Sequence, residues 1–266
     1  MAFFKGDIIS QSLGMNTQVN VIIPEIFDEN GKKKPGKLLY ALHGLSDNAT
    51  GWTRLTHIER LANQYNFTVI MPEVQRSFYT DMKYGPQYFT YIAEELPRLM
   101  KELFNIAADR ENTFVMGLSM GGYGALKCAL SRPENYKACA AYSSCADIQA
   151  RVEQADILGM TQEFKAVLGP DMSIEPKEDL FALASKLKET PGQRVPGLLL
   201  TCGTDDFLYQ DNQRLLHHLE RIGLPHEYYE WKGDHTWEFW EQSMKLAFDY
   251  FENGKISPSD YDFLRK

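Results

Sequence analysis

The chain has 266 residues, of which 28 are Lys or Arg and 36 are Asp or Glu, so its formal net charge is −8. Apolar residues make up 44% of the chain and charged residues 24%, which is typical of a globular protein and excludes an intrinsically disordered chain. An acidic chain without a basic run is a poor ligand for nucleic acid or an anionic membrane surface, so neither is expected as a partner.

Extended runs open the chain. Residues 8–13 and 17–23 flank Gly14, Met15 and Asn16, which predicts a β-hairpin at the edge of a sheet. Four later apolar runs are continuous rather than alternating, which is typical of strands buried on both faces of a parallel sheet. These runs are residues 38–42, 67–71, 113–116 and 198–202.

Helical patterns separate these predicted strands. After Pro86, apolar residues recur at helical spacing from Tyr88 to Phe104, and Pro97 inside this pattern predicts a kink. A second stripe at residues 215–222 is followed by Gly223, a typical C-cap. Strands that alternate with helices predict an α/β fold with a mostly parallel central sheet and helices on both faces.

Residues from about 147 to 194 carry no pattern of a buried strand. Short helical stretches there are interrupted by glycines and prolines, and the segment is too long for a simple loop. We therefore expect a single domain, residues 1–266, with a small helical cap inserted at about 147–194 over one end of the sheet. A pair of ordinary packing helices is the alternative.

The clearest chemical motif is Gly117-Leu118-Ser119-Met120-Gly121, which matches G-x-S-x-G. It follows a predicted strand and opens a helix of small residues. This is the context of the nucleophile elbow in the α/β-hydrolase fold, where a sharp turn requires glycines beside the serine. Ser119 is therefore the predicted nucleophile.

A serine hydroxyl needs a base and an orienting acid, and in this fold the acid precedes the histidine in the chain. The strand at 198–202 runs into Asp205 and Asp206. An acid at the carboxyl end of this strand lies at the same edge of the sheet as the nucleophile. We prefer Asp206, with Asp205 as the alternative.

The base is expected in the loop after the last strand. His235 lies directly after a strand-like run at residues 226–231 and before the final amphipathic helix, so it is the predicted base. His217 and His218 fall within a helical stripe, and His226 begins the strand-like run.

Two backbone N–H groups are needed to stabilise the oxyanion of an acyl-transfer reaction. One is expected from Met120, directly after the nucleophile, and the other from Leu45, in the loop after the strand at 38–42. Gly44 would allow this loop to approach closely. His43 is expected to make a structural hydrogen bond rather than to act as the base.

Aromatic residues cluster near the expected strand ends. We expect some of them to shape the pockets for the two halves of the substrate, although aromatic residues at such positions often belong to the core. The candidates are Trp52, Phe78, Tyr79 and Trp237, with Trp240 nearby.

Four motifs in this order resemble the esterase D-like group of α/β-hydrolases, and most closely the bacterial tributyrin esterases. They are His43-Gly44-Leu45, Gly117 to Gly122, Gly203 to Tyr209 and Gly233 to Trp237. The resemblance extends from about residue 20 to 251. It implies a cofactor-free serine carboxylesterase that hydrolyses short-chain acyl esters through an acyl-enzyme, with Asp206 as the acid.

Several relatives leave the substrate open. S-formylglutathione hydrolases share the first two of these motifs, His43-Gly44-Leu45 and Gly117 to Gly122, but their oxyanion loop typically continues with Thr-Cys, whereas this chain has Ser46-Asp47. Feruloyl and acetyl-xylan esterases share the architecture, and an acyltransferase would use the same residues. A catalytically silent binding protein with this fold is the alternative from a different class.

The remaining expectations concern location and assembly. The first residues lack the pattern of a secretory signal, and no apolar run reaches the roughly 18 residues of a membrane span. The four cysteines are not spaced as a metal site, so we expect free thiols, no metal and a cytoplasmic protein. The partner is then a small-molecule ester, and self-association into a homo-oligomer is open.

Overall fold

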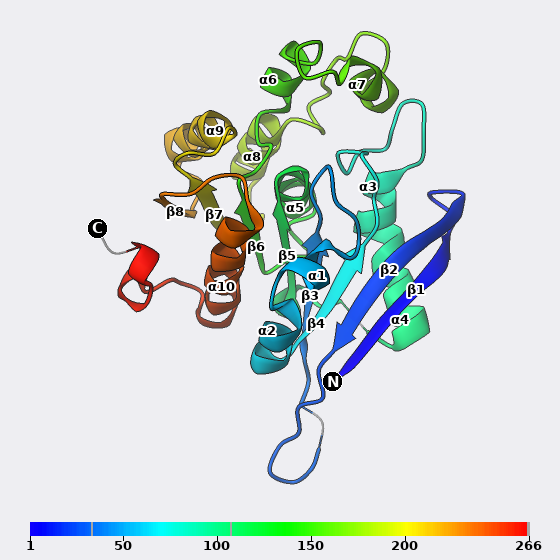
Figure 1. The fold of residues 1–266 in the computed structure, drawn as a ribbon, viewed down its shortest axis with the longest axis vertical. Helices are drawn as coiled ribbons and strands as arrows, with labels where there is room; N and C mark the ends of the chain where they lie inside the picture. The colour runs from blue at the N-terminus through cyan, green and yellow to red at the C-terminus, as the bar shows by residue number, and fades with distance from the viewer. Residues whose placement is uncertain (33, 107, 265–266) are drawn as a thin grey trace.

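The computed structural model describes residues 1–32, 34–106 and 108–264. These residues form one eight-stranded sheet in the order β1-β2-β4-β3-β5-β6-β7-β8, with helices around it (Figure 1). The strands from β4 to β8 run parallel, while β1 and β2 are antiparallel to their neighbours. The strands are β1(Ala2–Ser10), β2(Met15–Ile23), β3(Lys37–Leu42), β4(Phe67–Pro72), β5(Thr113–Leu118), β6(Ala138–Tyr142), β7(Gly197–Gly203) and β8(Glu227–Trp231).

The predicted edge hairpin is confirmed as β1 and β2, but its turn lies earlier than the sequence suggested. The turn occupies residues 11–14, and β2 already begins at Met15. Ser10 Oγ accepts a hydrogen bond from the N–H of Leu13 at 3.0 Å, and Gly14 has a φ of 66°. The chain therefore reverses at Gly14 itself, where a left-handed conformation costs little.

All four predicted buried strands are present as β3, β4, β5 and β7. The sequence analysis missed β6, which reads Ala-Cys-Ala-Ala-Tyr and lies between β5 and β7. Alanine is depleted in strands, so propensity alone gave no signal for this segment. All five residues of β6 are buried, so its neighbours in the sheet impose the extended conformation.

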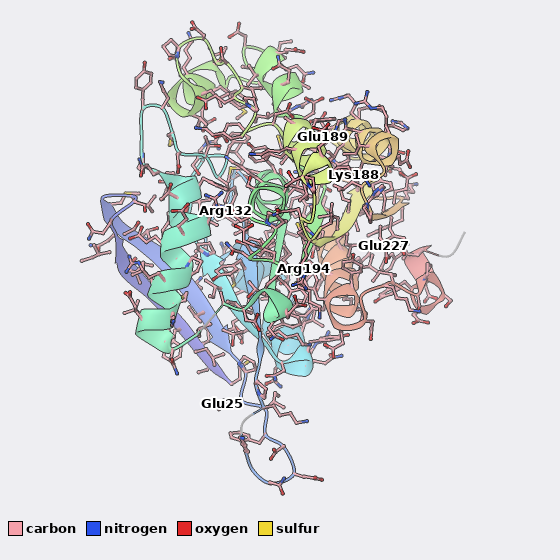
Figure 2. The ribbon with its side chains drawn as sticks, turned by 180° about the vertical axis from the view of Figure 1, so that it is seen from behind. Glu25, Arg132, Lys188, Glu189, Arg194 and Glu227 are labelled. Atoms are coloured by element: carbon pink, nitrogen blue, oxygen red, sulfur yellow. The ribbon has the colours of Figure 1, made fainter. Side chains whose placement is uncertain are left out.

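Helices cover both faces of the sheet, and each face has its own apolar core. One core lies under α1(Gly51–Leu55), α2(Ile58–Tyr65) and α10(Trp237–Asn253). The opposite core lies under a larger set of helices, seen from behind in Figure 2. This set comprises α3(Tyr88–Thr90), α4(Leu96–Phe104), α5(Met120–Ser131), α8(Leu180–Glu189) and α9(Tyr209–Ile222).

The helical stripe from Tyr88 to Phe104 is interrupted before Pro97. A π-helical turn at Tyr91–Glu95 joins α3 to α4. Proline has no N–H and its ring crowds the carbonyl of the preceding turn, so the wider winding of a π-turn relieves the conflict. The irregularity predicted at Pro97 is therefore found in the turn before it.

The segment at 147–194 contains α6(Ile148–Glu153), α7(Thr161–Leu168) and α8. Figure 1 shows α6 and α7 beyond one end of the sheet. In contrast, α8 packs within the same core as α5 and α9. The assignment of the whole segment as a cap on a single domain stays a prediction.

Short 3₁₀ turns complete the described chain. They are η2(Arg110–Asn112), η3(Pro258–Asp260) and η4(Asp262–Leu264). No helix among the described residues has both the length and the apolar character needed to cross a bilayer.

Candidate active site

Ser119 lies at the junction of β5 and α5. β5 is next to β3 in the sheet, and from β3 the chain continues to β4 on one side and later to β5 on the other. Its backbone has φ 55° and ψ −119°, a conformation that L-residues rarely adopt. The turn is held by a hydrogen bond from the Ser119 N–H to the carbonyl of Tyr142 at 2.9 Å. The N–H of Cys145 donates to the Ser119 carbonyl at 3.0 Å. Both backbone groups of Ser119 are thus held by the end of β6 and the segment that follows it.

The glycines beside Ser119 are required by close packing. A Cβ at Gly117 would collide with the backbone of Gly121, and a Cβ at Gly121 would collide with the carbonyl of Leu42 on β3. The predicted steric reason for the G-x-S-x-G pattern therefore holds in detail, because β3, β5 and α5 meet at these two positions.

The structure brings the three predicted polar side chains together, although they lie 116 and 29 residues apart in the chain. His235 Nε2 lies 3.0 Å from Ser119 Oγ. His235 Nδ1 lies 3.0 and 2.9 Å from the two carboxylate oxygens of Asp206. Asp206 is buried and also accepts the N–H of Leu208 at 2.8 Å, whereas Asp205 is exposed.

Two aromatic rings flank the imidazole of His235. The Phe207 ring centroid lies 4.5 Å from that of His235, and the Trp240 ring packs edge-on at 4.8 Å. These contacts restrict rotation of the imidazole and leave only 16% of the His235 side chain exposed. Phe207 itself is 66% exposed, which is unusual for a phenylalanine and places it at the rim of the site.

The two predicted oxyanion donors lie beside Ser119. Within the described part of the chain, neither the Leu45 N–H nor the Met120 N–H donates a hydrogen bond to another protein group, and both residues line one cavity with Ser119. Met120 is the first residue of α5, so the positive end of the helix dipole also faces this point. This arrangement suits a negative charge that develops on a substrate oxygen.

His43 is confirmed as a structural residue. Its ring is fully buried, with Nδ1 2.8 Å from the carbonyl oxygen of Gly44 and Nε2 3.1 Å from the N–H of Val74. Nδ1 must therefore carry the proton, and Nε2 accepts. Of the other histidines, His218 contacts Ser185 and the Phe181 carbonyl, remote from Ser119 in the fold.

Two cavities meet at Ser119. The smaller has a volume of about 200 Å³ and is almost wholly apolar. Its walls include Phe78, Met160, Phe164 and Leu208. The larger, of about 460 Å³, lies along the oxyanion loop and includes Asp47, His235 and Trp237. An ester that binds with its carbonyl at Ser119 would direct one half into each cavity.

Of the aromatic residues predicted to contact substrate, Phe78 and Trp237 line these cavities, but Trp52 and Tyr79 do not. Both Trp52 and Tyr79 are fully buried, which corrects that expectation. Trp52 packs edge-on against Trp237 at 5.5 Å and supports the wall from behind. Trp52 and Tyr79 therefore belong to the core and do not contact the substrate.

The sequence analysis missed several residues of the small cavity. Leu158, Met160 and Phe164 come from the segment at 147–194, and Phe207 follows directly after Asp206. The position of Phe207 inside a chemical motif was a usable signal. The other three carry no signal, because a segment of short helices does not reveal which side chains it places over a distant serine.

Cys145 is the only thiol in the wall of the small cavity as described. Burial, with the nearby Asp211 carboxylate, raises the pKa of the Cys145 thiol to about 12. It is therefore a neutral apolar wall residue near neutral pH, and Ser119 has no thiolate competitor there. The described residues also contain no group of three or more His, Cys, Asp or Glu side chains placed to hold a metal ion.

Known proteins share both sequence and structure with this chain. A family model described as a putative esterase matches residues 10–251. An acetyl esterase from Caldicellulosiruptor saccharolyticus is 32% identical over 261 residues, which cover 94% of this chain and 98% of that protein.

Solved structures of serine hydrolases are similar to this chain as well. The substrate-bound fluorophosphonate-binding serine hydrolase FphF of Staphylococcus aureus is 34% identical, with a TM-score of 0.84 over 95% of this chain and 98% of that chain. An S-formylglutathione hydrolase, FrmB, from the same organism is 32% identical, with a TM-score of 0.80 over 95% and 99% of the two chains.

Proposed function

The chain belongs to the putative esterase family and is a carboxylic ester hydrolase, and we propose that it hydrolyses short-chain acyl esters through Ser119, His235 and Asp206. The observation that carries this proposal is the unbroken series of contacts from Ser119 Oγ through both imidazole nitrogens to a buried carboxylate. No cofactor takes part in the proposed reaction.

In the first step, His235 Nε2 accepts the hydroxyl proton while Ser119 Oγ attacks the ester carbonyl. Asp206 accepts the Nδ1–H, so the imidazole is held in the tautomer with a free Nε2 and its positive charge is stabilised. The tetrahedral intermediate then collapses, His235 returns the proton to the departing alkoxide, and an alcohol leaves. Water repeats the sequence on the acyl-enzyme and releases the acid.

The carbonyl oxygen becomes an oxyanion in both tetrahedral intermediates. We assign the Leu45 and Met120 N–H groups as the donors that bind it, since both lie beside Ser119 and neither donates to an acceptor among the described residues. Loss of one such donor typically costs about 3–4 kcal/mol in transition-state stabilisation.

The small cavity supports a short acyl group as the preferred substrate. Its volume of about 200 Å³ is below the roughly 300–1,000 Å³ of pockets that hold drug-sized ligands, and its walls are apolar. The larger cavity, of about 460 Å³, would take the alcohol. The similarity to FrmB also favours S-formylglutathione, a thioester with a very small acyl group, as a second candidate substrate.

The first prediction is that Ser119→Ala lowers kcat for p-nitrophenyl acetate by more than about 10³-fold while the fold is kept. The matched control is Ser144→Ala, which removes another buried serine hydroxyl that makes no hydrogen bond to the described residues. A Ser119→Ala variant with near-parental turnover, at an unchanged melting temperature, would show that Ser119 is not the nucleophile.

The second prediction concerns the acyl group. In a panel from acetyl to octanoyl esters, with S-formylglutathione, methyl ferulate and acetylated xylan alongside, kcat/KM is highest for short acyl groups. Met160→Ala should raise kcat/KM for octanoyl relative to acetyl esters by about tenfold, because it removes part of the cavity wall.

Met172→Ala is the control for this effect, since Met172 is half-buried on the same core but is not part of the cavity wall. If the parent enzyme prefers octanoyl esters, or if Met160→Ala and Met172→Ala alter the acyl preference equally, the small cavity is not the acyl site.

A cytoplasmic location goes with this proposal. Cys128, Cys139, Cys145 and Cys202 are all free and buried thiols in the structure, a state that suits a reducing compartment.

A further inference from the structure

The backbone between β4 and α3 contains an unusual turn. Phe78 and Tyr79 are consecutive residues with φ values of 51° and 49°, a conformation that costs free energy for any residue with a Cβ atom. Both side chains are buried. The Tyr79 ring lies against Gly124 of α5, where a Cβ would collide with it. Such strain persists only where surrounding contacts enforce it. The contacts of this turn therefore indicate what the strained conformation does.

The first contact joins Tyr79 to the oxyanion loop. The Tyr79 hydroxyl donates to the carbonyl oxygen of His43 at 2.9 Å. The ring of His43 in turn holds the Gly44 carbonyl, at 2.8 Å. Each peptide group is planar, so the Gly44 carbonyl and the Leu45 N–H rotate as one unit. Fixing these two successive carbonyls therefore fixes the direction of the Leu45 N–H.

This restraint matters because the intervening residue is a glycine. A Cβ at Gly44 would lie 2.8 Å from Leu118 Cδ1, so a larger residue there would force the Leu118 side chain to move. A glycine lets the peptides on either side rotate more freely than any other residue does. The hydroxyl of Tyr79 is thus one of the few groups that keep this flexible point in a single conformation.

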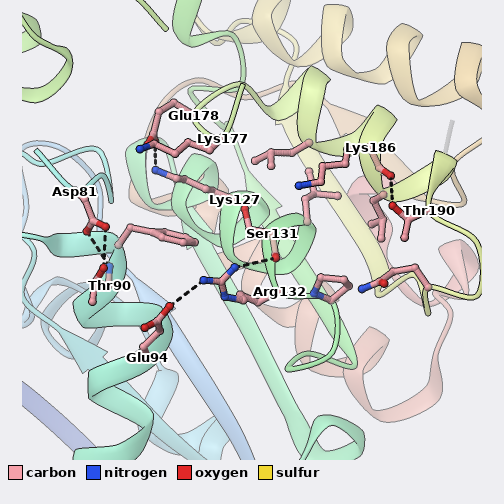
Figure 3. Close-up of a pocket in the computed structure, with 16 residues that line it drawn as sticks. Asp81, Thr90, Glu94, Lys127, Ser131, Arg132, Lys177, Glu178, Lys186 and Thr190 are labelled. Atoms are coloured by element: carbon pink, nitrogen blue, oxygen red, sulfur yellow. Dashed lines mark hydrogen bonds and ion pairs between the residues drawn. The ribbon is translucent and has the colours of Figure 1, made fainter. Parts of the chain in front are cut away.

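The second contact anchors the turn from the other side. Lys127 of α5 donates from Nζ to the Tyr79 carbonyl and to Thr80 Oγ1, each at 3.0 Å, and forms an ion pair with Glu178. Figure 3 shows Lys127 directed at Glu178, with a dashed line between them. Tyr123, also on α5, donates to the Glu178 carbonyl at 2.7 Å. Lys127 and Glu178 are both almost fully buried.

The anchor and the second oxyanion donor thus share one helix. α5 begins with Met120, whose N–H is one proposed donor, and two turns later carries Lys127, which holds the turn that orients the other. The relative position of the two N–H groups is then set through a short chain of buried contacts. A buried ion pair contributes little net stability, but it can favour one conformation over others. Here that conformation is the turn that contains Tyr79.

We propose that Tyr79 is a positioning residue for the esterase reaction, orienting the Leu45 N–H through the His43 carbonyl, and that the buried Lys127–Glu178 pair holds Tyr79 in place. The inference rests on the proposed function, because it takes Leu45 as an oxyanion donor. Tyr79 does not touch the substrate, and it acts on the transition state rather than on substrate binding.

The test is Tyr79→Phe, which removes the hydroxyl and keeps the ring against Gly124. We expect kcat to fall by about tenfold with KM changed less than about twofold, since the donor is misaligned rather than lost. The affinity for a boronic acid, which forms a tetrahedral adduct on the serine, should fall by a similar factor. Tyr136→Phe is the control, because Tyr136 is a comparably buried phenol on the same core that contacts Cys128.

A second variant tests the anchor without leaving one charge unpaired. The double change Lys127→Met with Glu178→Gln should lower kcat in the same way, and adding Tyr79→Phe should lower it little further, because both act through the same carbonyl. If this double variant does not fold, Tyr79→Phe alone decides the proposal.

Other results would overturn the inference. An unchanged kcat in Tyr79→Phe, a change in KM alone, or a lower kcat with undiminished boronic acid affinity would each show that the hydroxyl has only a structural role. Failure of the proposed function is distinguishable, because Ser119→Ala would then keep its activity whatever Tyr79→Phe does.

Discussion

Two adjacent carboxylates at the end of β7 have opposite environments. Asp206 is buried and contacts His235 Nδ1 through both oxygens, whereas Asp205 points to solvent and its N–H donates to the Gly233 carbonyl at 2.9 Å. A single residue of register therefore separates a side chain that can orient the imidazole from one that only shapes a turn.

The third prediction follows from this difference. Asp206→Asn should lower kcat by about 10³–10⁴-fold, because an amide no longer favours the Nδ1–H tautomer or stabilises the imidazolium. Asp205→Asn is the matched control and should keep kcat within about twofold. Steady-state kinetics on an activated ester measure both. Equal losses in the two variants, or a larger loss in Asp205→Asn, would reverse the assignment of the acid.

Among the elements, the edge hairpin is joined to the helical layer by one carboxylate. Glu95, at the end of the π-helical turn, accepts the Ser10 hydroxyl at 2.6 Å and the N–H groups of Gln11 and Ser12 at 2.8 and 3.0 Å. Burial alone would raise the pKa of Glu95, but these hydrogen bonds outweigh it and hold the pKa below its usual 4.5. The turn of the hairpin is thus bound to an ionised side chain.

The fourth prediction is that Glu95→Gln lowers the free energy of unfolding by about 1–3 kcal/mol near neutral pH, because charge-assisted hydrogen bonds are lost. A carboxyl whose pKa is lower in the folded state stabilises the fold above its unfolded pKa, and this contribution disappears as pH falls through the folded value. The difference from the parent should therefore shrink below about pH 4.5.

Urea unfolding of both proteins at several pH values measures this difference. Glu94→Gln is the control, since Glu94 is an exposed neighbour that pairs with Arg132 on the surface. A difference for Glu95→Gln that stays constant down to pH 3 would mean that the carboxylate charge contributes nothing.

Across the whole molecule, the sheet separates two apolar cores. The four tryptophans are all on one side: Trp52, Trp231 and Trp240 belong to the core under α1, α2 and α10, and Trp237 packs against it. Their fluorescence therefore reports on one face alone. Circular dichroism in the far ultraviolet reports on helices of both faces and of the segment at 147–194.

The fifth prediction uses this asymmetry. If residues 1–266 form a single domain, urea unfolding followed by tryptophan fluorescence and by far-ultraviolet circular dichroism should have the same midpoint. Repeating it at two protein concentrations separates self-association, which would shift the midpoint with concentration. Two separate transitions would show instead that the two layers, or the helices at 147–194, unfold independently.

The sequence by itself was enough for the features that depend on neighbours along the chain. Gly117, Ser119 and Gly121 predicted the turn because its steric conflict is local, and continuous apolar runs predicted four of the strands. The alanine-rich β6 was not predicted, because its strand conformation comes from pairing with β5 and β7 on either side.

Only the tertiary structure decided the features that depend on contacts between distant segments. The wall that Met160 forms near Ser119 and the burial of Trp52 and Tyr79 are of this kind. In each case a rotation of the segment about its own axis would change which side chains face the cavity and which face the core. Such differences are set by packing across the sheet, and no pattern of neighbouring residues records them.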